Sequence, residues 1–361
     1  MKILILANND IGLYKFRKEL IENLLQKHDI SICLPDGEFV KDLVSMGCTF
    51  IPCELLDRRG TNPIKDLSLF HFYKALMKNS KPNIVFTYTI KPNVYGGAAC
   101  ASLRIPYVAN ITGLGTAVEN GGFLQIIALA LYKFGLRKSQ KVFFQNTENQ
   151  QFFIDRGIVM DNQDLLPGSG VNLRQFAVKD YPSDDKVIRF AFISRIMKEK
   201  GIDQYLDTAK FIKKKYPNTE FHICGFCEDD YESTLKEYID NNLVIYHGMI
   251  HDIADFLKDI HCVIHPTYYP EGISNVLLES CASGRPIITT DRAGCREVID
   301  DEVNGFLVIQ RDSDSLIKAV ENFLELGNEE RKTMGLNGRM KVEREFDRKI
   351  VVKKYIEELK R

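Results

Sequence analysis

The 361-residue chain has almost no net charge, since 48 Lys and Arg oppose 49 Asp and Glu and leave a formal charge of −1. A field that would draw the protein to nucleic acid is therefore absent. The chain also lacks a long apolar run. The apolar run in the opening MKILILANND is too short for a signal-peptide core or a membrane-spanning helix. The later run at Phe123–Tyr132, which contains Gln125, is also too short. We therefore expect a cytoplasmic protein with no nucleic-acid partner.

Two common cysteine and glycine patterns are missing as well. The nine cysteines have no regular spacing and most lie in strand-like apolar runs, which argues against a disulfide framework. The one CxxC, Cys224–Cys227, has no second ligand pair and is interpreted as ordinary cysteine. The loop ANNDIGLYKFR has a single glycine, Gly12, instead of GxGxxG, so NAD binding there is disfavoured. This loop is either a plain strand-to-helix turn or a ligand-contacting loop.

Short β-branched runs alternate with helical patterns along the whole chain. KILILA, DISICLP, TFIPCEL, NIVFTY, PYVANIT and KVFFQN precede a polar stretch at Val178–Val187, and IRFAFIS, EFHICG, LVIYHG, HCVIHPT, PIITT and GFLVI follow it. Apolar strands that alternate with helices predict parallel sheets covered on both faces. The sequence thus predicts an α/β protein with two doubly wound domains, 1–180 and 181–345, and a terminal helix at 346–361 that could dock on either, including back on the first.

In open α/β sheets, ligands bind beyond the carboxyl ends of the strands, so two such domains predict an interdomain cleft. In SRIMKEKGIDQYLDTA, Arg195 and Lys200 follow a predicted strand and precede a helix that begins near Gly201. Two cations beside free backbone N–H groups suit a diphosphate. The alternative is solvated surface charge.

The stretch PEGISNVLLES places one carboxylate, Glu279, on an otherwise apolar helix and a second, Glu271, in the loop before it. Ser274 or Asn275 can cap this helix. Because a buried carboxylate without a partner is costly, Glu279 is best interpreted as an acceptor for a polar ligand group such as a ribose diol. The alternative is that it points to solvent.

No metal site is predicted. The DSD at Asp312–Asp314 precedes a helical pattern and is interpreted as a helix cap. The histidine pairs His247/His251 and His261/His265 have no third ligand nearby. We expect no cofactor and no metal requirement, because Arg195 and Lys200 supply the cations.

Several of these segments resemble the retaining glycosyltransferases of family four, which have the GT-B fold. HPTYYPEGISNVLLESCASGRPIITTDRAGCREVIDDEVNGFLV resembles the donor-binding half, in which Glu271 and Glu279 match the family's E-x7-E pattern. SRIMKEKG resembles its donor-phosphate loop, and GMIHDIADFLKDIHCVIHPT its base-pocket segment. FTYTIKPNVYGG and NITGLGTA look like the subgroup that builds bacterial capsules, O-antigens and lipid-linked oligosaccharides. The resemblance covers nearly the whole chain.

The resemblance implies a role for each matching residue. Glu279 would hold the ribose, and Glu271 would contact the transferred sugar. Arg195 and Lys200 would neutralise the leaving diphosphate. The donor would also contact the backbone of Gly272, Ile273, Ser274 and Asn275, and its base would contact Met249 of the base-pocket segment.

One position departs from the family. Many members carry a His at the end of the fourth strand, where this chain has Tyr88. Thr89 and Lys91 are nearby candidates to share its role in orienting the sugar. With the loop glycines Gly12, Gly113 and Gly115, they are the candidate acceptor and cleft residues.

The implied activity is transfer of a sugar, with retention of configuration, from a nucleotide donor, most simply a UDP-sugar, to a polyprenyl-diphosphate-linked or other glycan acceptor. Two alternatives remain open. One is a UDP-sugar 2-epimerase of the same fold, and the other is a non-catalytic sugar-nucleotide-binding partner subunit.

The segment GGFLQIIALALYKFGLRKSQK contains one apolar stripe at helical spacing, made of Phe123, Ile126, Ile127, Ala130, Leu131 and Phe134. Four cations follow, Lys133, Arg137, Lys138 and Lys141. One interpretation is a packed helix with cations at the negative end of its dipole. The other is a helix that rests on the anionic inner membrane leaflet as a peripheral attachment.

Overall fold

The computed structural model describes residues 1–56, 62–119, 121–183, 187–228 and 230–360. Residues 184–186 of the predicted linker Val178–Val187 lie outside the described residues. The chain divides into two compact units. Unit 1 consists of Met1–Gly170, Pro270–Ile273 and Arg348–Arg361, and unit 2 of Val171–Tyr269 and Ser274–Asp347.

Unit 1 is built on a parallel sheet of seven strands in the order β3-β2-β1-β4-β5-β6-β7. The strands are β1 (Lys2–Leu6), β2 (Asp29–Leu34), β3 (Thr49–Pro52), β4 (Ile84–Tyr88), β5 (Tyr107–Ile111), β6 (Lys141–Phe144) and β7 (Gln163–Leu165). The three-residue β7 was not predicted. The order reverses between β1 and β4, the arrangement of a doubly wound sheet.

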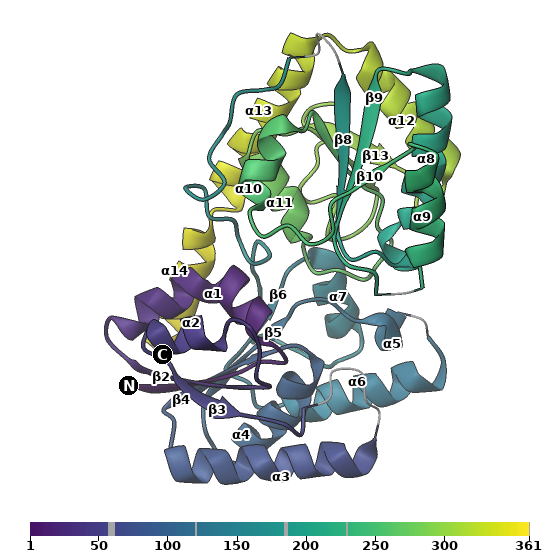
Figure 1. The fold of residues 1–361 in the computed structure, drawn as a ribbon. Coiled ribbons are helices and arrows are strands. Elements are labelled where there is room, and N and C mark those ends of the chain that lie inside the picture. Colours follow the sequence, from purple (N-terminus) through teal and green to yellow (C-terminus); the bar gives the residue numbers. More distant parts are fainter. Residues whose placement is uncertain (57–61, 120, 184–186, 229, 361) are drawn as a thin grey trace. The chain divides into compact units, whose positions relative to one another are not determined.

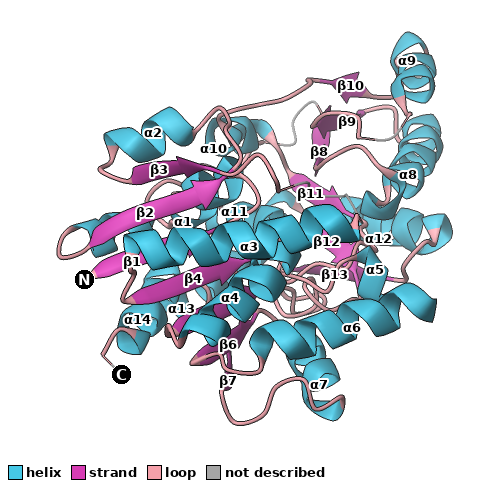
Figure 2. Cartoon of the chain, turned by 90° about the horizontal axis from the view of Figure 1, so that it is seen from below, coloured by secondary structure: helices cyan, strands magenta, loops and turns pink. Residues whose placement is uncertain are grey.

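Helices cover both faces of this sheet. They are α1 (Asp10–Leu25), α2 (Val40–Ser45), α3 (Pro63–Ser80), the π-helix η1 (Pro92–Gly96), α4 (Gly97–Leu103), α5 (Thr116–Glu119), α6 (Gly122–Leu136), α7 (Thr147–Asp155) and α14 (Arg348–Glu358). Figure 1 shows α1, α2 and α14 on one face and α3, α4 and α6 on the other. In Figure 2, α3 lies in front of the strands. Apolar strand residues are buried against both layers, as expected for a parallel sheet.

Unit 2 repeats the plan with a parallel sheet of six strands in the order β10-β9-β8-β11-β12-β13. The strands are β8 (Ile188–Ile193), β9 (Thr219–Cys224), β10 (Ile245–Tyr246), β11 (Cys262–His265), β12 (Ile287–Thr290) and β13 (Gly305–Val308). The helices are η2 (Lys198–Lys200), α8 (Ile202–Lys215), α9 (Glu232–Asp240), α10 (Ile253–Phe256), η3 (Leu257–Asp259), α11 (Asn275–Ala282), α12 (Ser313–Glu325) and α13 (Asn328–Glu345). The two predicted doubly wound sheets are thus present.

The chain passes from unit 1 to unit 2 at Gly170–Val171 rather than at the predicted position near 180. Val171 donates its N–H to the Phe346 carbonyl (2.8 Å) and forms a parallel bridge with Asp347, which ties this segment to the end of α13. Helix α14 belongs to unit 1, where its Tyr355 is fully buried against β4, β5 and β6. Non-local backbone pairing sets both boundaries, so the local polarity of Val178–Val187 could not reveal them.

Candidate active site

The loop between β8 and α8 brings two cations close together in unit 2. Lys200 is buried although it lies in a Lys-rich loop. Gly201, which precedes α8, has φ +79°, and a Cβ at this position would lie 2.1 Å from the Pro266 carbonyl oxygen. Only glycine fits such a conformation with the loop packed this closely on the segment after β11. The helix start that we predicted near Gly201 is confirmed.

Tyr269 joins the two cations. The Arg195 Cζ lies 5.2 Å and the Lys200 Nζ 4.9 Å from the centroid of its ring, within the range of cation–π attraction. Arg195 also forms an ion pair with Glu228. The Tyr268 N–H donates to the Glu199 carbonyl at 2.8 Å, and the Tyr269 N–H to the Thr267 hydroxyl at 3.1 Å. The backbone at Tyr268 and Tyr269 is therefore held by the Glu199 carbonyl and the Thr267 hydroxyl.

Sequence reasoning missed Tyr269 and Glu228. Glu228 reaches Arg195 because its N–H donates to the Ile196 carbonyl at 3.0 Å, while the Ile196 N–H donates to the Phe226 carbonyl at 2.8 Å. These non-local contacts leave no mark in the sequence. The only available signal was the place of Tyr269 immediately before the stretch PEGISNVLLES.

Helix α11 places Glu279 in unit 2. The carboxylate is half-buried, and Leu277, Leu278, Cys281 and Ala282 are fully buried in the predicted manner. Ser274 occupies the N-cap position but its side chain does not cap the helix, because its hydroxyl lies 3.0 Å from His265 Nε2. Asn275 does not cap it either, since it is the first helical residue. Its Oδ1 is buried with no hydrogen-bond partner in the described part of the chain, which suits contact with a bound ligand.

The segment Pro270–Ile273, which carries Glu271, is part of unit 1. The Ile273 N–H donates to Gln145 Oε1 at 3.1 Å, and Asn146 Nδ2 donates to the Gly272 carbonyl at 2.7 Å. Glu271 is half-buried. Glu271 and Glu279 thus belong to different units. Gln145 and Asn146 were not predicted, although QN directly follows a predicted strand in KVFFQN.

Of the predicted acceptor glycines, Gly12 lies in the first turn of α1 and not in a loop, whereas Gly113 and Gly115 lie in the loop between β5 and α5 of unit 1. The Gly12 N–H donates to Asn9 Oδ1 at 2.7 Å, which is the N-cap bond of α1. Gly113 and Gly115 have φ +147° and +76°. A Cβ on Gly113 would lie 2.7 Å from the Pro270 carbonyl oxygen, so this loop packs against the segment that carries Glu271.

The three side chains near the end of β4 differ in their surroundings. Tyr88 is buried, the Arg17 Cζ lies 5.1 Å from its ring centroid, and burial holds the pKa of Tyr88 well above its usual value. Thr89 has φ +71°, which is uncommon for a β-branched residue, and its buried hydroxyl has no partner in the described part of the chain. Lys91 forms a 2.7 Å ion pair with Asp66. Their roles toward an acceptor stay predictions.

The predicted base-pocket residue Met249 follows β10 and is exposed. Beside it, His247 Nε2 lies 2.9 Å from His222 Nδ1, and the two rings stack. Burial lowers the pKa of both histidines. Neutral imidazoles are therefore favoured at this edge of unit 2.

Asp312 caps α12, as predicted, because its Oδ1 accepts a 2.9 Å bond from the Ser315 N–H. Among the described residues, no three His, Cys, Asp or Glu side chains are grouped so that they could hold a metal ion. Metal independence stays a prediction.

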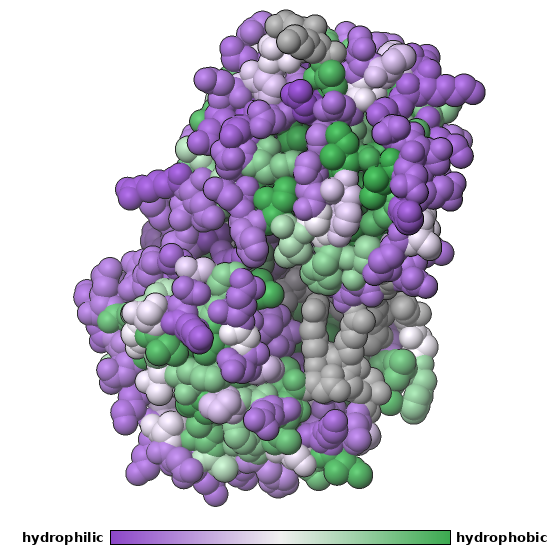
Figure 3. Space-filling model, in the orientation of Figure 1, coloured by the Kyte–Doolittle hydropathy of each residue, from purple (hydrophilic) through white to green (hydrophobic). Residues whose placement is uncertain are grey.

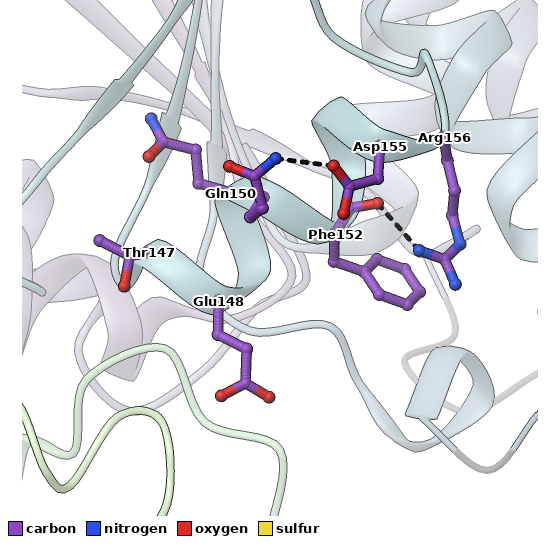
Figure 4. A pocket seen from close by; sticks show the side chains of 7 residues that line it. Thr147, Glu148, Gln150, Phe152, Asp155 and Arg156 are labelled. Atoms are coloured by element: carbon purple, nitrogen blue, oxygen red, sulfur yellow. Dashed lines mark hydrogen bonds between the residues drawn. The ribbon is translucent and has the colours of Figure 1, made fainter.

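An open hollow of about 610 Å³ lies along α7. Its lining residues all come from the stretch 147–156, and Figure 4 shows Glu148 and Arg156 among the side chains around it. Gln151 donates to Asp155 at 2.6 Å, and Arg156 to the Phe152 carbonyl at 3.2 Å. None of the predicted site residues lines this hollow.

Comparison with known proteins identifies the family of the chain. Residues 174–341 match the family model described as glycosyl transferases group 1, and residues 2–146 match the one described as glycosyl transferase 4-like. The chain is 24% identical, over 342 residues that cover 90% of each protein, to N,N'-diacetylbacillosaminyl-diphospho-undecaprenol alpha-1,3-N-acetylgalactosaminyltransferase of Campylobacter jejuni. It is also 24% identical, over 92% of this chain and 90% of the relative, to the capsular polysaccharide biosynthesis glycosyltransferase CapM of Staphylococcus aureus.

Among solved structures, HepE of Anabaena in complex with UDP and glucose has the same fold, with a TM-score of 0.81, 18% identity and coverage of 100% of this chain and 99% of that one. Two parallel doubly wound sheets, two matched family models and relatives that cover nearly the full chain support one conclusion. The chain belongs to the family-four glycosyltransferases and has the GT-B fold.

Proposed function

We propose that this enzyme transfers a sugar from a UDP-sugar, with retention of configuration, to a polyprenyl-diphosphate-linked glycan in bacterial surface polysaccharide synthesis. The observation that carries the donor assignment is the convergence of Arg195 and Lys200 on Tyr269 at the start of α8. A diphosphate is the donor group that two such cations suit. The UDP complex of HepE and the diphospho-undecaprenol acceptor in the name of the Campylobacter relative support the two substrate classes.

In the proposed reaction, an acceptor hydroxyl attacks the anomeric carbon from the face that UDP leaves. The glycosyl–phosphate bond breaks, and the hydroxyl proton passes to the departing phosphate. Arg195 and Lys200 stabilise the negative charge that develops on the diphosphate. Glu279 accepts hydrogen bonds from the ribose hydroxyls and Glu271 from hydroxyls of the transferred sugar. Glu271 is not a covalent nucleophile in this scheme.

A donor screen tests the proposal. UDP release is measured with UDP-glucose, UDP-galactose, UDP-GlcNAc and UDP-GalNAc, with and without a polyprenyl-diphosphate-linked sugar. We expect glycosidic product with the donor's anomeric configuration only when the acceptor is present, and unchanged turnover in EDTA. Free epimerised sugar without acceptor would indicate the epimerase, and binding without turnover would indicate the partner subunit. If chelation abolishes turnover and Mg²⁺ restores it, the phosphate assignment is wrong.

The surface of helix α6 supports the proposal of a lipid-linked acceptor. Tyr132, Gly135 and Leu136 are its buried side, and the Tyr107 hydroxyl donates to the Gly135 carbonyl at 2.6 Å. Its other side is apolar and exposed, with Phe123 76%, Leu124 60%, Ile126 65%, Ile127 41% and Phe134 46% accessible. Figure 3 shows hydrophobic residues at the surface over this end of unit 1. A packed core helix would not leave this face uncovered.

Three of the four predicted cations, Lys133, Arg137 and Lys138, are exposed at the end of α6 that follows this apolar side. Lys141 is not among them. It begins β6 and is only 9% exposed, because the chain turns into the sheet immediately after the helix. No described helix is long and apolar enough to cross a bilayer. An apolar face beside cations fits an anionic bilayer surface, and α6 is therefore proposed as the peripheral membrane contact.

A further inference from the structure

The four-residue segment Pro270–Ile273 belongs to unit 1, although the chain on both sides of it belongs to unit 2. Tyr269 before it and Ser274 after it both belong to unit 2, whereas the segment itself packs in unit 1. Helix α11, with Glu279, continues in unit 2 directly afterwards. The backbone of Glu271 is therefore placed by unit 1, although its neighbours in sequence are held by the other unit.

Three amide side chains hold this segment, and we refer to Gln145, Asn146 and Asn149 as the amide clamp. Asn146 Nδ2 lies 2.7 Å from the Gly272 carbonyl oxygen and 3.4 Å from that of Glu271. Asn149 Nδ2 lies 3.5 Å from the Glu271 carbonyl oxygen, and Gln145 Oε1 accepts the Ile273 N–H at 3.1 Å. The clamp residues are 6%, 2% and 7% exposed. Buried amides are costly unless bonded, so these contacts are strongly specified.

Each clamp residue is oriented by a regular element. Gln145 directly follows the last residue of β6. Asn146 is the N-cap of α7, and its Oδ1 accepts the Asn149 N–H at 2.8 Å. Asn146 thus uses its oxygen for the helix and its NH₂ group for the segment. The fit is close, because a Cβ on Gly272 would lie 2.1 Å from Gln145 Oε1.

We infer that the amide clamp is a set of positioning residues that fixes Glu271 toward the sugar being transferred. The inference rests on the proposed function, in which Glu271 contacts the transferred sugar while Glu279, Arg195 and Lys200 bind UDP. The latter three lie in unit 2, so loosening the clamp impairs sugar transfer and leaves UDP affinity intact.

The variant Asn146→Asp separates the capping of α7 by this residue from its hydrogen bond to the Gly272 carbonyl. Aspartate caps a helix as well as asparagine does, so α7 keeps its N-cap. Its carboxylate cannot donate to the Gly272 carbonyl and faces it oxygen to oxygen. We expect kcat/KM for the UDP-sugar that turns over in the donor screen to fall by roughly ten- to a hundredfold, the range for a buried acceptor left unsatisfied. The Kd of UDP alone should change less than about twofold.

Gln151→Glu is the matched control. It makes the same amide-to-acid change on the same helix, at an exposed side chain whose amide donates to Asp155. We expect it to leave kcat/KM unchanged. A fall in UDP affinity for Asn146→Asp equal to its fall in kcat/KM would indicate general damage and overturn the positioning role.

Hydrogen exchange gives a readout that needs no donor. The peptide that contains Gly272 and Ile273 should exchange faster in Asn146→Asp than in wild type, and at the wild-type rate in Gln151→Glu. Unchanged exchange of this peptide would overturn the clamp, and faster exchange with full activity would overturn its positioning role.

The single variants Glu271→Ala and Asn146→Asp separate failure of the proposed function from failure of this inference, and the double variant Asn146→Asp/Glu271→Ala tests whether the two residues act together. If Glu271→Ala alone retains full turnover, the proposed role of Glu271 is wrong. If Glu271→Ala is impaired and Asn146→Asp is not, only the clamp fails. We expect Asn146→Asp to lower kcat/KM by less than about twofold in the Glu271→Ala background, because residues that act through one another are not additive.

Discussion

Asn110 donates its Nδ2 to the Tyr355 hydroxyl at 2.8 Å, across 245 residues of sequence. The bond joins β5 to α14 inside the buried core of unit 1, where the Tyr355 ring also meets Phe86 and Phe143 at 5.1 Å between centroids. The C-terminal helix is therefore part of the N-terminal unit through a polar contact as well as through apolar packing.

Tyr355→Phe keeps the ring but removes the hydroxyl. It should destabilise unit 1, because the buried Asn110 NH₂ group loses its acceptor. Such a loss costs about 1–3 kcal/mol, and we expect a lower midpoint of thermal unfolding. Tyr14→Phe is the control, since it keeps the stacking of Tyr14 on Phe39 at 4.9 Å. Equal unfolding midpoints for the two variants would show that the hydroxyl bond contributes nothing.

Glu279→Ala should weaken UDP binding. Loss of a hydrogen bond to a charged group costs about 1.5–3 kcal/mol, which is about tenfold or more in Kd. Isothermal titration calorimetry with UDP measures the change. An unchanged Kd in a folded Glu279→Ala protein would remove the ribose role from this residue.

Tyr269→Leu should also raise the Kd of UDP, because the two cations proposed to bind the diphosphate lose the aromatic ring that both contact. Each cation–π contact contributes about 0.5–1 kcal/mol at a partly exposed site, so we expect about a five- to thirtyfold weaker complex. Tyr269→Phe keeps the ring and should bind UDP like wild type. If the Phe and Leu variants bind UDP equally, the ring does not hold Arg195 and Lys200.

Replacement of Lys133, Arg137 and Lys138 by Ser should release the protein from anionic vesicles. Three cations near such a surface contribute about 3 kcal/mol together, and salt should weaken the attachment of wild type in the same way. Flotation with phosphatidylglycerol-containing liposomes measures the bound fraction, and the variant should keep its affinity for UDP.

A control for that experiment replaces Lys210, Lys214 and Lys236 of unit 2 by Ser, which changes the net charge equally at exposed positions. It should float like wild type. A separate pair of changes, Phe123→Ser with Ile126→Ser, should reduce flotation at every salt concentration, since it removes apolar contact. Full flotation of both α6 variants would leave this helix without a membrane role.

The sequence by itself determined the parts that depend on neighbouring residues. Strands and helices follow from hydrophobic period, and all twelve predicted strands lie in the two parallel sheets. The start of α8 after Gly201 and the capping role of Asp312 follow from local backbone chemistry. The buried side of α11 follows from the spacing of its apolar residues.

Tertiary structure decided what depends on segments far apart in the chain. Only the folded chain shows that the segment carrying Glu271 is held in unit 1 by Gln145 and Asn146, and that α14 completes the core of unit 1. The same holds for the convergence of Arg195 and Lys200 on Tyr269 and for the burial of Lys141 in β6. Hydrogen bonds and burial form between residues that the fold brings together, and a linear pattern records only the side chains available for them.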